Sequence, residues 1–480
     1  MLIMSNYNKH KLFIFLSSVS YLFCLTIGII KDLSIISLVP LLLLFIYTSV
    51  VNYKFIFYLV VFLTPLSMSL RDLGYSFDIE MAFPTEPILF GLMILSLFKI
   101  IYNFQLFKPL FKTSFVFFLL LYIFWLFITS ITSSMPLVSF KFLISRLWYI
   151  LPFFIIGSLF FQDQKNILQF IKSYTLPFTA VILYTIARHS KYFFDKESAH
   201  FVMSPFFNDH TSYGAMIAFF IPLAIAMLML SKKKLLVRLL WLLIIIILLS
   251  GLILSYTRAA WISLFIAFIC VAVLRLRIKK GIIFLCLGLL LCLGLFFQGN
   301  IFQLLEGNRQ DSSDNLLEHV SSLSNISTDA SNMERINRWK CALEMFIEKP
   351  IFGWGPGTYQ FQYAPFQLYN DKTIISSNRG DMGNAHSEYL SVLAESGLIG
   401  LFLFVSLIIT VLYKAINMYY LNIHPEHNIL MLSFICALLT YFIHGLFNNF
   451  LDTDKASVAI WAIMSMIISL DIYIPKKQRL

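Results

Sequence analysis

Apolar residues fill most of the chain in long runs, which short polar or charged segments separate. A helix that crosses a lipid bilayer needs about 20 mostly apolar residues. By that criterion the pattern predicts fourteen membrane spans, at residues 12–30, 34–51, 54–70, 87–102, 113–133, 147–161, 166–187, 213–231, 237–256, 259–275, 281–298, 389–413, 428–447 and 456–474. Several of these runs are short for a span. We therefore expect an all-α, polytopic transmembrane protein with about 12–14 spans.

The composition supports lipid as the solvent for most of the chain. Of the 480 residues, 59% are hydrophobic and 13% are charged, whereas roughly 25% are charged in ordinary soluble domains. The net charge of +11 is better explained by lysine and arginine in cytoplasmic loops than by nucleic-acid binding. No basic stripe is interleaved with solvent-facing aromatic residues, as a nucleic-acid-binding surface would require. We expect membrane lipids as partners and no nucleic acid.

Charge placement predicts the orientation in the membrane. Lysine and arginine gather at 108–112, 232–238, 275–280 and 476–479, which become cytoplasmic loops or tails if the N-terminus is inside. The first apolar run is interpreted as a retained span, so both termini are expected in the cytoplasm. Four regions follow: N-terminal transmembrane helices at 1–187, transmembrane helices with outer-face motifs at 188–298, a large outer loop at 299–388, and C-terminal transmembrane helices at 389–480.

The second half of the large loop has a helical pattern. Apolar residues recur from Met333 to Ile347 with the spacing of an amphipathic helix. Arg335 and Arg338 are three residues apart and fall on one side of that helix. After Lys349-Pro350 ends it, Gly353, Gly355 and Gly357 form a turn in which glycine permits positive φ and close backbone approach.

Arg258 interrupts two apolar runs at the predicted outer membrane face. A charge at bilayer depth costs about 2.5–3.5 kcal/mol on insertion scales, so it usually has a partner or a function. A snorkelling arginine at a helix–helix turn is the alternative. An anion-binding role is favoured, because Ala259, Ala260 and Trp261 follow directly and a guanidinium suits phosphate.

His386 lies where the large loop re-enters the membrane. Its unperturbed pKa is near neutrality, so it can accept a proton from an attacking hydroxyl. A helix-start histidine bonded to a carbonyl is the alternative, and it would be preferred if His386 stood alone. A metal site from His386 and Glu388 is weakly supported, because no further ligands are spaced to complete it.

A third group, Asn208-Asp209-His210, precedes another span at the same face. Asp209 is as well explained as a helix cap as by a role in a site. Arg188 begins the same loop, and a solvated position is its more ordinary interpretation. No nucleotide-binding loop and no serine nucleophile elbow occurs in the sequence, so the expected substrate is anionic and lipid-embedded.

In these segments the chain resembles the O-antigen ligase and O-antigen polymerase superfamily of bacterial envelope glycosyltransferases. The resemblance covers roughly residues 200–415. It rests on the ordered set Asn208-Asp209-His210, Ser255-Tyr256-Thr257-Arg258, Arg335-x-x-Arg338-Trp339, Ile351-Phe352-Gly353-Trp354-Gly355-Pro356-Gly357-Thr358, Asn384-Ala385-His386-Ser387-Glu388-Tyr389-Leu390 and Glu395-Ser396-Gly397-Leu398-Ile399-Gly400-Leu401.

The resemblance implies transfer of a glycan from undecaprenyl diphosphate to an acceptor hydroxyl at the periplasmic face of the bacterial inner membrane. His386 matches the loop histidine that orients or deprotonates the acceptor, and Arg258 matches the arginine that holds the donor diphosphate. Neither metal nor cofactor is implied, and inversion by direct attack is expected. The family's second arginine has Arg188 as its nearest candidate here, with His200 or Lys196 as alternatives.

A ligase would use a lipid A–core sugar as acceptor, a polymerase a second lipid-linked glycan, and a third variant would glycosylate protein. The ligase reading is preferred. A polysaccharide transporter or flippase is the rival from another class, and it predicts charges inside the spans and short outer loops. The remaining candidates to line the site are Asn208, Asp209, His210, Arg335, Arg338, Gly355, Gly357, Asn384 and Glu388.

Overall fold

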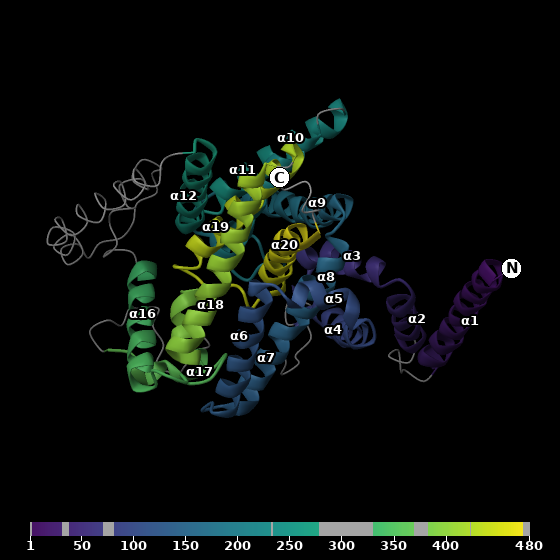
Figure 1. Ribbon diagram of the computed structural model, residues 1–480, viewed down its shortest axis with the longest axis horizontal. Coiled ribbons are helices and arrows are strands. Elements are labelled where there is room, and N and C mark those ends of the chain that lie inside the picture. The colour runs from purple at the N-terminus through teal and green to yellow at the C-terminus, as the bar shows by residue number, and fades with distance from the viewer. Residues whose placement is uncertain are drawn as a thin grey trace. The chain divides into compact units, whose positions relative to one another are not determined.

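The computed structural model describes residues 2–30, 38–70, 81–231, 234–277, 330–368, 383–422 and 424–473 (Figure 1). Within these ranges the chain is almost entirely helical. Two short strands, β1 (Met68–Ser69) and β2 (Ala82–Phe83), pair antiparallel with Met68 opposite Phe83. The predicted span at 281–298 and the first part of the large loop lie outside the described residues.

The chain divides into two compact units, Met1–Phe62 and Leu63–Leu480. The first unit holds α1 (Leu2–Ile30), α2 (Leu38–Val51) and most of α3 (Tyr53–Leu63). The second unit holds the two strands and η2 (Thr64–Leu66), α4 (Thr85–Tyr102), α5 (Phe104–Phe111), α6 (Ser114–Ile131), α7 (Pro136–Tyr149), η3 (Ile150–Ile156), α8 (Gly157–Phe160), α9 (Gln164–His189), η4 (Ser190–Tyr192), η5 (Ser198–His200), α10 (His210–Leu230), α11 (Leu235–Leu254), α12 (Arg258–Arg275), α16 (Ala330–Glu348), α17 (Tyr359–Gln362), η6 (Ala364–Phe366), α18 (Glu388–Leu421), α19 (Pro425–His444) and α20 (Asp454–Tyr473).

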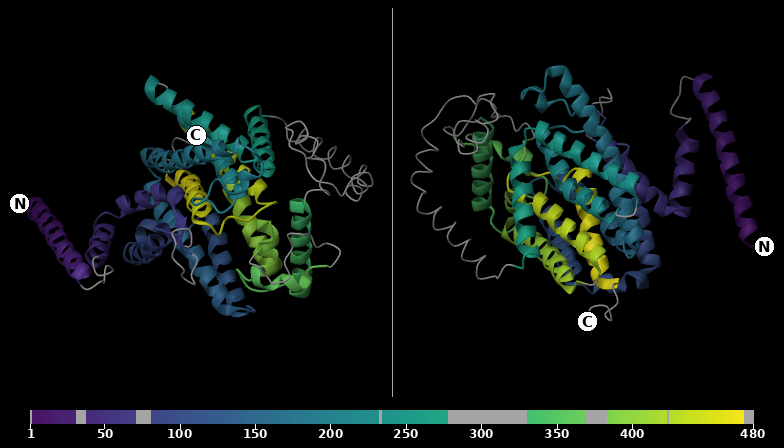
Figure 2. Two further views of the ribbon diagram at one scale, coloured as in Figure 1. Left: turned by 180° about the vertical axis from the view of Figure 1, so that it is seen from behind. Right: turned by 90° about the horizontal axis from the view of Figure 1, so that it is seen from above.

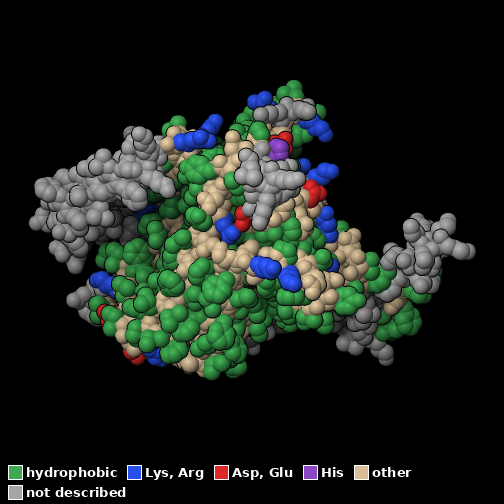
Figure 3. Space-filling model, viewed as in Figure 1, with side chains coloured by type: hydrophobic (Ala, Val, Ile, Leu, Met, Phe, Trp, Pro, Cys, Tyr) green, Lys and Arg blue, Asp and Glu red, His purple; other side chains and the backbone are tan. Residues whose placement is uncertain are grey.

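Ten helices among the described residues are long and apolar enough to cross a membrane, and the bent pair Phe45–Val51 and Tyr53–Leu66 raises the number to eleven. Large side chains on these helices are exposed, as Phe124 (60%), Phe265 (67%) and Phe402 (64%) illustrate. Hydrophobic side chains also cover most of the face that Figure 3 shows. Soluble proteins rarely expose apolar patches of this extent. The predicted all-α, polytopic membrane protein is therefore confirmed.

The sixth predicted span, at 147–161, begins too late. The structure has one apolar helical stretch from Pro136 to Phe160, in which a π-helical turn at η3 joins α7 to α8. Proline is favoured in the first turn of a helix because its missing N–H would have no partner there. Arg146 lies just before the predicted start of this span, and its guanidinium is buried against Leu451 and Asp452.

α20 lies at the centre of the second unit and is the most deeply buried of the candidate spans described. Two of its serines donate hydrogen bonds to carbonyls of the neighbouring η3–α8 segment, Ser465 to Phe154 and Ser469 to Ser158, each at 2.8 Å. Small hydroxyl residues let helices approach closely in lipid. These bonds hold the second half of α20 against the η3–α8 segment.

α16 ends at Glu348, close to the predicted stop, and lies alongside α18, with α6 and α7 on the other side of α18 (Figures 1 and 2). The glycine turn follows with the predicted positive φ at Gly353, Gly355 and Gly357. It docks onto α18, since Gly355 N–H donates to the carbonyl of Glu395 at 2.9 Å. The glycine turn is therefore a packing element of the scaffold.

Candidate functional site

Helix ends from distant parts of the sequence meet in the second unit. Thr257, just before α12, donates from Oγ1 to the carbonyl of His210 at the start of α10 (2.9 Å). Gly214 permits this contact, because a methyl group there would lie 2.7 Å from Thr257 Oγ1. The contact brings Arg258, the first residue of α12, beside the first turn of α10. Asp209 caps that turn, accepting from the backbone N–H groups of Thr211 and Ser212.

His386 has a left-handed backbone, with φ of 47°. Two neighbours hold it there. Asn384 accepts the His386 N–H at its side-chain oxygen (3.0 Å), and Trp339 Nε1 of α16 donates to the His386 carbonyl (3.1 Å). Non-glycine residues in this region cost of order 1–3 kcal/mol and cluster at functional sites. The histidine is thus held in position from both α16 and the segment that leads into α18.

The His386 imidazole has a spare nitrogen. Its Nδ1 atom is buried and has no hydrogen-bond partner among the described residues. Burial, together with the charges of Arg335 and Arg338, lowers the pKa of His386 to about 4. The imidazole is therefore neutral at neutral pH, which leaves it able to accept a proton.

Arg335 acts electrostatically on His386, His210 and His444 alike. Arg338 is held by Glu334, which accepts from its Nε at 2.6 Å, and its guanidinium lies 3.8 Å from the centre of the Tyr363 ring. We call His210, His386, His444, Arg335 and Arg338 the histidine–arginine cluster. The structure thus brings together both predicted loop arginines and two predicted histidines.

His444 and Asn448 are members of this neighbourhood that the sequence analysis missed. The Asn448 amide donates to His444 Nε2 at 3.3 Å and also bonds the His386 side chain. His444 in turn faces the backbone of Ala259, next to Arg258. The sequence did contain a signal for His444, because it is a histidine inside a predicted span and ionisable groups at membrane depth usually have a functional role.

A cavity of about 680 Å³ adjoins the cluster. The predicted residues Asn208, Asp209 and Asn384 line it. Further walls come from residues that the sequence analysis did not propose for a site, at 67–69, 81–86 and 449–455, which contribute Glu86, Asp452 and Lys455 among others. We call this space the acidic cavity, since four carboxylates and one lysine line it.

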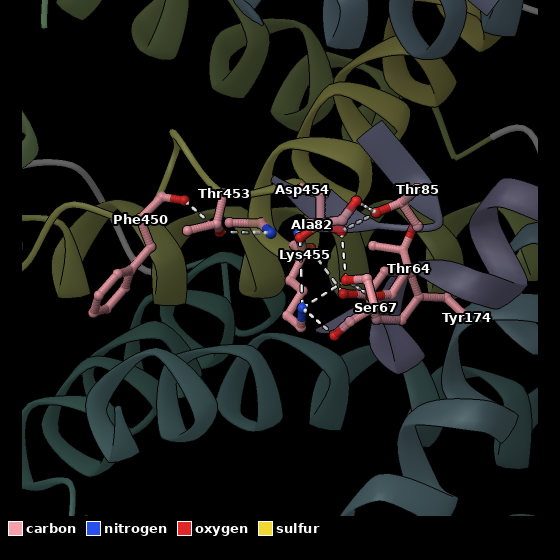
Figure 4. Close-up of polar contacts among 10 residues, drawn as sticks. Thr64, Ser67, Ala82, Thr85, Tyr174, Phe450, Thr453, Asp454 and Lys455 are labelled. Atoms are coloured by element: carbon pink, nitrogen blue, oxygen red, sulfur yellow. Dashed lines mark hydrogen bonds and ion pairs between the residues drawn. The ribbon is translucent and has the colours of Figure 1, made fainter. Parts of the chain in front are cut away.

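One wall of the acidic cavity is a fully bonded charge pair (Figure 4). Asp454 Oδ2 accepts from Ser67 Oγ and Thr85 Oγ1, both at 2.6 Å. Lys455 Nζ donates to Ser67 Oγ at 2.7 Å and lies 3.5 Å from Asp454 Oδ1. Tyr174 donates to the Lys455 carbonyl at 2.8 Å. These bonds tie the start of α20 to the β1–β2 region and α4.

Other predicted residues have packing partners. Arg188 donates to the Ser204 carbonyl and so holds the 190–209 loop. Glu388 is buried and accepts from Tyr441 OH (2.6 Å) and from the N–H groups of Phe450 and Leu451 (2.7 and 2.8 Å).

The glycine turn also lies apart from the cavity lining. Gly355 packs against Ser133 and Ser139, and Gly357 packs against Phe142. Among the described residues, no group of three or more His, Cys, Asp or Glu side chains is placed to hold a metal ion.

Fold and site together define a polytopic α-helical membrane protein whose polar side chains gather where helix ends meet. Residues 243–405 match the family model of the O-antigen ligase. The chain is therefore similar to this family over about a third of its length, and the predicted resemblance is confirmed. The match implies a glycosyltransferase-type activity of the ligase or polymerase kind. A comparison with curated proteins finds no similar protein.

Proposed function

We propose that this protein transfers a glycan from undecaprenyl diphosphate to an acceptor hydroxyl at the periplasmic face of the bacterial inner membrane. The reaction is metal-independent, uses no cofactor and inverts the anomeric carbon. The observation that carries the proposal is His386, a neutral imidazole under the charges of Arg335 and Arg338 whose buried Nδ1 has no partner among the described residues. Asn384, which bonds the His386 backbone, lines the cavity. Both termini lie in the cytoplasm, and the large loop lies in the periplasm.

Arg258, Arg335 and Arg338 supply the donor half of the site in this proposal. A diphosphate carries negative charge before transfer and gains more as the sugar–oxygen bond breaks. Positioned guanidinium groups stabilise that developing charge best in a poorly hydrated site. Arg258 adds its charge at the N-terminus of the 18-residue helix α12, where the helix dipole also favours anions.

His386 supplies the acceptor half. The acceptor oxygen forms a bond to the anomeric carbon, the bond from that carbon to the diphosphate oxygen breaks, and the diphosphate leaves with the electron pair. The hydroxyl proton passes to the imidazole. Because Arg335 and Arg338 lower the pKa of His386, a bound diphosphate offsets their charge and makes the histidine a stronger base. Donor binding thus raises the pKa of His386 before the acceptor is deprotonated.

The acceptor distinguishes the versions of this function. We propose a ligase-like reaction with a lipid A–core or other glycan acceptor, with polymerisation onto a second lipid-linked glycan as the alternative. Supplying purified protein with the lipid-linked glycan alone, and then with lipid A–core added, separates them. Product in the first reaction indicates a polymerase, and product only in the second indicates a ligase.

The decisive experiment compares two site variants with two matched controls in proteoliposomes. Arg258→Ala and His386→Ala are expected to lose transfer and to leave the lipid-linked donor unconsumed. Arg238→Ala lies near the opposite end of α11 and His424→Ala at the opposite end of α19, where both side chains are exposed, so both controls should keep transfer. Full transfer by both site variants at equal protein levels would overturn the mechanism.

The transporter alternative makes a different prediction in the same vesicles. A flippase moves the lipid-linked glycan across the bilayer without consuming it, so an enzyme that attacks the glycan from outside would gain access to it over time. The proposed transferase instead converts the donor to product and free carrier diphosphate. Movement without conversion would favour the transporter.

A further inference from the structure

We propose that the acidic cavity is the acceptor-sugar pocket and that it selects neutral or amino sugars over phosphorylated or uronic-acid sugars. This inference rests on the proposed function, because it assigns one of the two substrates of that reaction to a defined space. It adds a specificity rule that concerns the charge of the acceptor sugar.

The dimensions and the lining of the cavity suit a saccharide. Its volume of about 680 Å³ lies within the range of about 300–1,000 Å³ of small-molecule sites. Phe206, Phe207 and Phe450 line it together with amide and hydroxyl side chains. Apolar rings can pack against the C–H faces of a sugar while the polar groups bond its hydroxyls.

Asn449 supplies an observation independent of the carboxylates. It lines the cavity, and its side-chain oxygen Oδ1 is buried without a hydrogen-bond partner among the described residues. A buried acceptor that lacks a donor costs about 1–3 kcal/mol. A hydroxyl group of a bound sugar is the kind of donor that would satisfy it.

The charge of the lining explains the selection. Asp452 is paired with Arg146 and Asp454 with Lys455, so the cations at the lining are already bonded, and Asp209 adds a further negative charge. A carboxylate or phosphate on the sugar would meet these carboxylates, and the described lining residues offer no unbonded cation to balance its charge. Hydroxyl and ammonium groups, which donate hydrogen bonds, meet acceptors instead.

The position of the cavity suits the reaction. Asn384, which holds the His386 backbone, and Asp209, which is next to His210, both line it. The cavity therefore borders the two segments that carry His210 and His386. In this proposal an anionic donor group is drawn to the cations of the histidine–arginine cluster, whereas the acceptor sugar enters the acidic cavity.

The test measures sugar binding in the absence of donor. Full-length protein in lipid nanodiscs is titrated with methyl glucoside, methyl glucosaminide and methyl glucuronide, and binding is followed by saturation-transfer NMR. We expect the first two to bind and the glucuronide to bind at least tenfold more weakly. Asn449→Ala should weaken glucoside binding by about tenfold, the equivalent of one lost hydrogen bond.

Charge variants test the selection itself. Asp209→Asn keeps a good helix cap but removes a charge, so it should narrow the difference in affinity between glucuronide and glucoside. Glu344→Gln, on the exposed side of α16, is the control and should change neither affinity.

Three results would overturn the proposal: binding of no glycoside, equal binding of glucuronide and glucoside, or unchanged binding in Asn449→Ala and in a cavity-filling Asn449→Trp variant that melts like the wild type. Failure of the proposed function looks different. In that case the glycosides bind as expected, but no glycan leaves the diphosphate carrier.

Discussion

Two groups of polar side chains lie near one cavity, and they differ in how many of their polar atoms are hydrogen-bonded. The first is the Asp454–Lys455 pair, and the second is His386 with Arg335 and Arg338. Both carboxylate oxygens of Asp454 and the ammonium of Lys455 have partners within the protein. His386 Nδ1 has none among the described residues, and its backbone is held at positive φ. Full bonding stabilises a fold, whereas unused bonding capacity in a strained residue is typical of a site that acts on a ligand.

The largest expected effect falls on the fully bonded pair. Lys455→Met leaves the buried Asp454 carboxylate without its cation, which should lower the free energy of unfolding by about 3–5 kcal/mol. Thermal melting in detergent measures the loss. The double variant Asp454→Asn with Lys455→Met removes both charges and should recover most of it. If Lys455→Met melts like the wild type, the Asp454–Lys455 pair does not stabilise the fold as described.

His386→Gly should have opposite effects on rate and stability. Glycine adopts the left-handed backbone without strain, so the free energy of unfolding should rise by about 1–2 kcal/mol. Loss of the proton acceptor should lower the transfer rate by about 10²–10⁴-fold. Melting and single-turnover transfer are measured on the same preparation. Lower stability together with normal transfer would contradict both assignments.

Gly355→Ala tests the scaffold at the glycine turn. Its φ of 111° and its contact with Ser133 leave no room for a methyl group, and the substitution should cost about 1–3 kcal/mol. The transfer rate per folded molecule should stay the same, because Gly355 does not line the cavity. A lower rate in protein that melts normally would give the turn a direct role.

The smallest expected effect is a shift in pH dependence. The pKa of His386 is lowered to about 4, so at limiting donor the acid limb of transfer should fall near pH 4, with little change from about pH 5.5 to 8. Arg335→Gln removes one cause of the lowering and should move that limb upward, towards the ordinary value of 6.5. An acid limb near 6.5 in the wild type would show that His386 is an ordinary exposed histidine.

Protonation of His386 also links pH to stability. Between about pH 4 and 6.5 the unfolded chain binds a proton that the folded protein excludes, so stability should rise with pH across this window. The variant His386→Asn should flatten that rise.

Hydropathy and periodicity were sufficient to predict most helices of the second unit and the amphipathic helix α16. The Asn384–Glu388 segment and the loop arginines were found because their residue types and order are distinctive. The acidic cavity could not be found in this way. Its walls at 67–69, 81–86 and 449–455 include segments far apart in sequence, and the bonds between Ser67, Thr85 and Asp454 form only after α4 and α20 have packed.

Arg146 shows a second limit of hydropathy. It lies just outside the predicted span at 147–161, yet the guanidinium is buried because Leu451 and Asp452 accept its hydrogen bonds. The partner of a buried charge lies elsewhere in the chain, so a local window cannot distinguish such a residue from a loop residue. For His444 the residue type inside a predicted span was a usable signal, but its contact with the backbone of Ala259 on another helix could not be predicted from the local sequence.

α16 carries Arg335 and Arg338 and also Trp339, which bonds the backbone of His386. In the proposed reaction, α16 therefore carries both the arginines that bind the donor diphosphate and the tryptophan that positions His386, the proton acceptor. Until the donor is bound, the histidine stays too weakly basic to activate water. The costly lipid-linked glycan would thus be protected from wasteful hydrolysis, and the order of substrate entry would follow from the charge of a single helix.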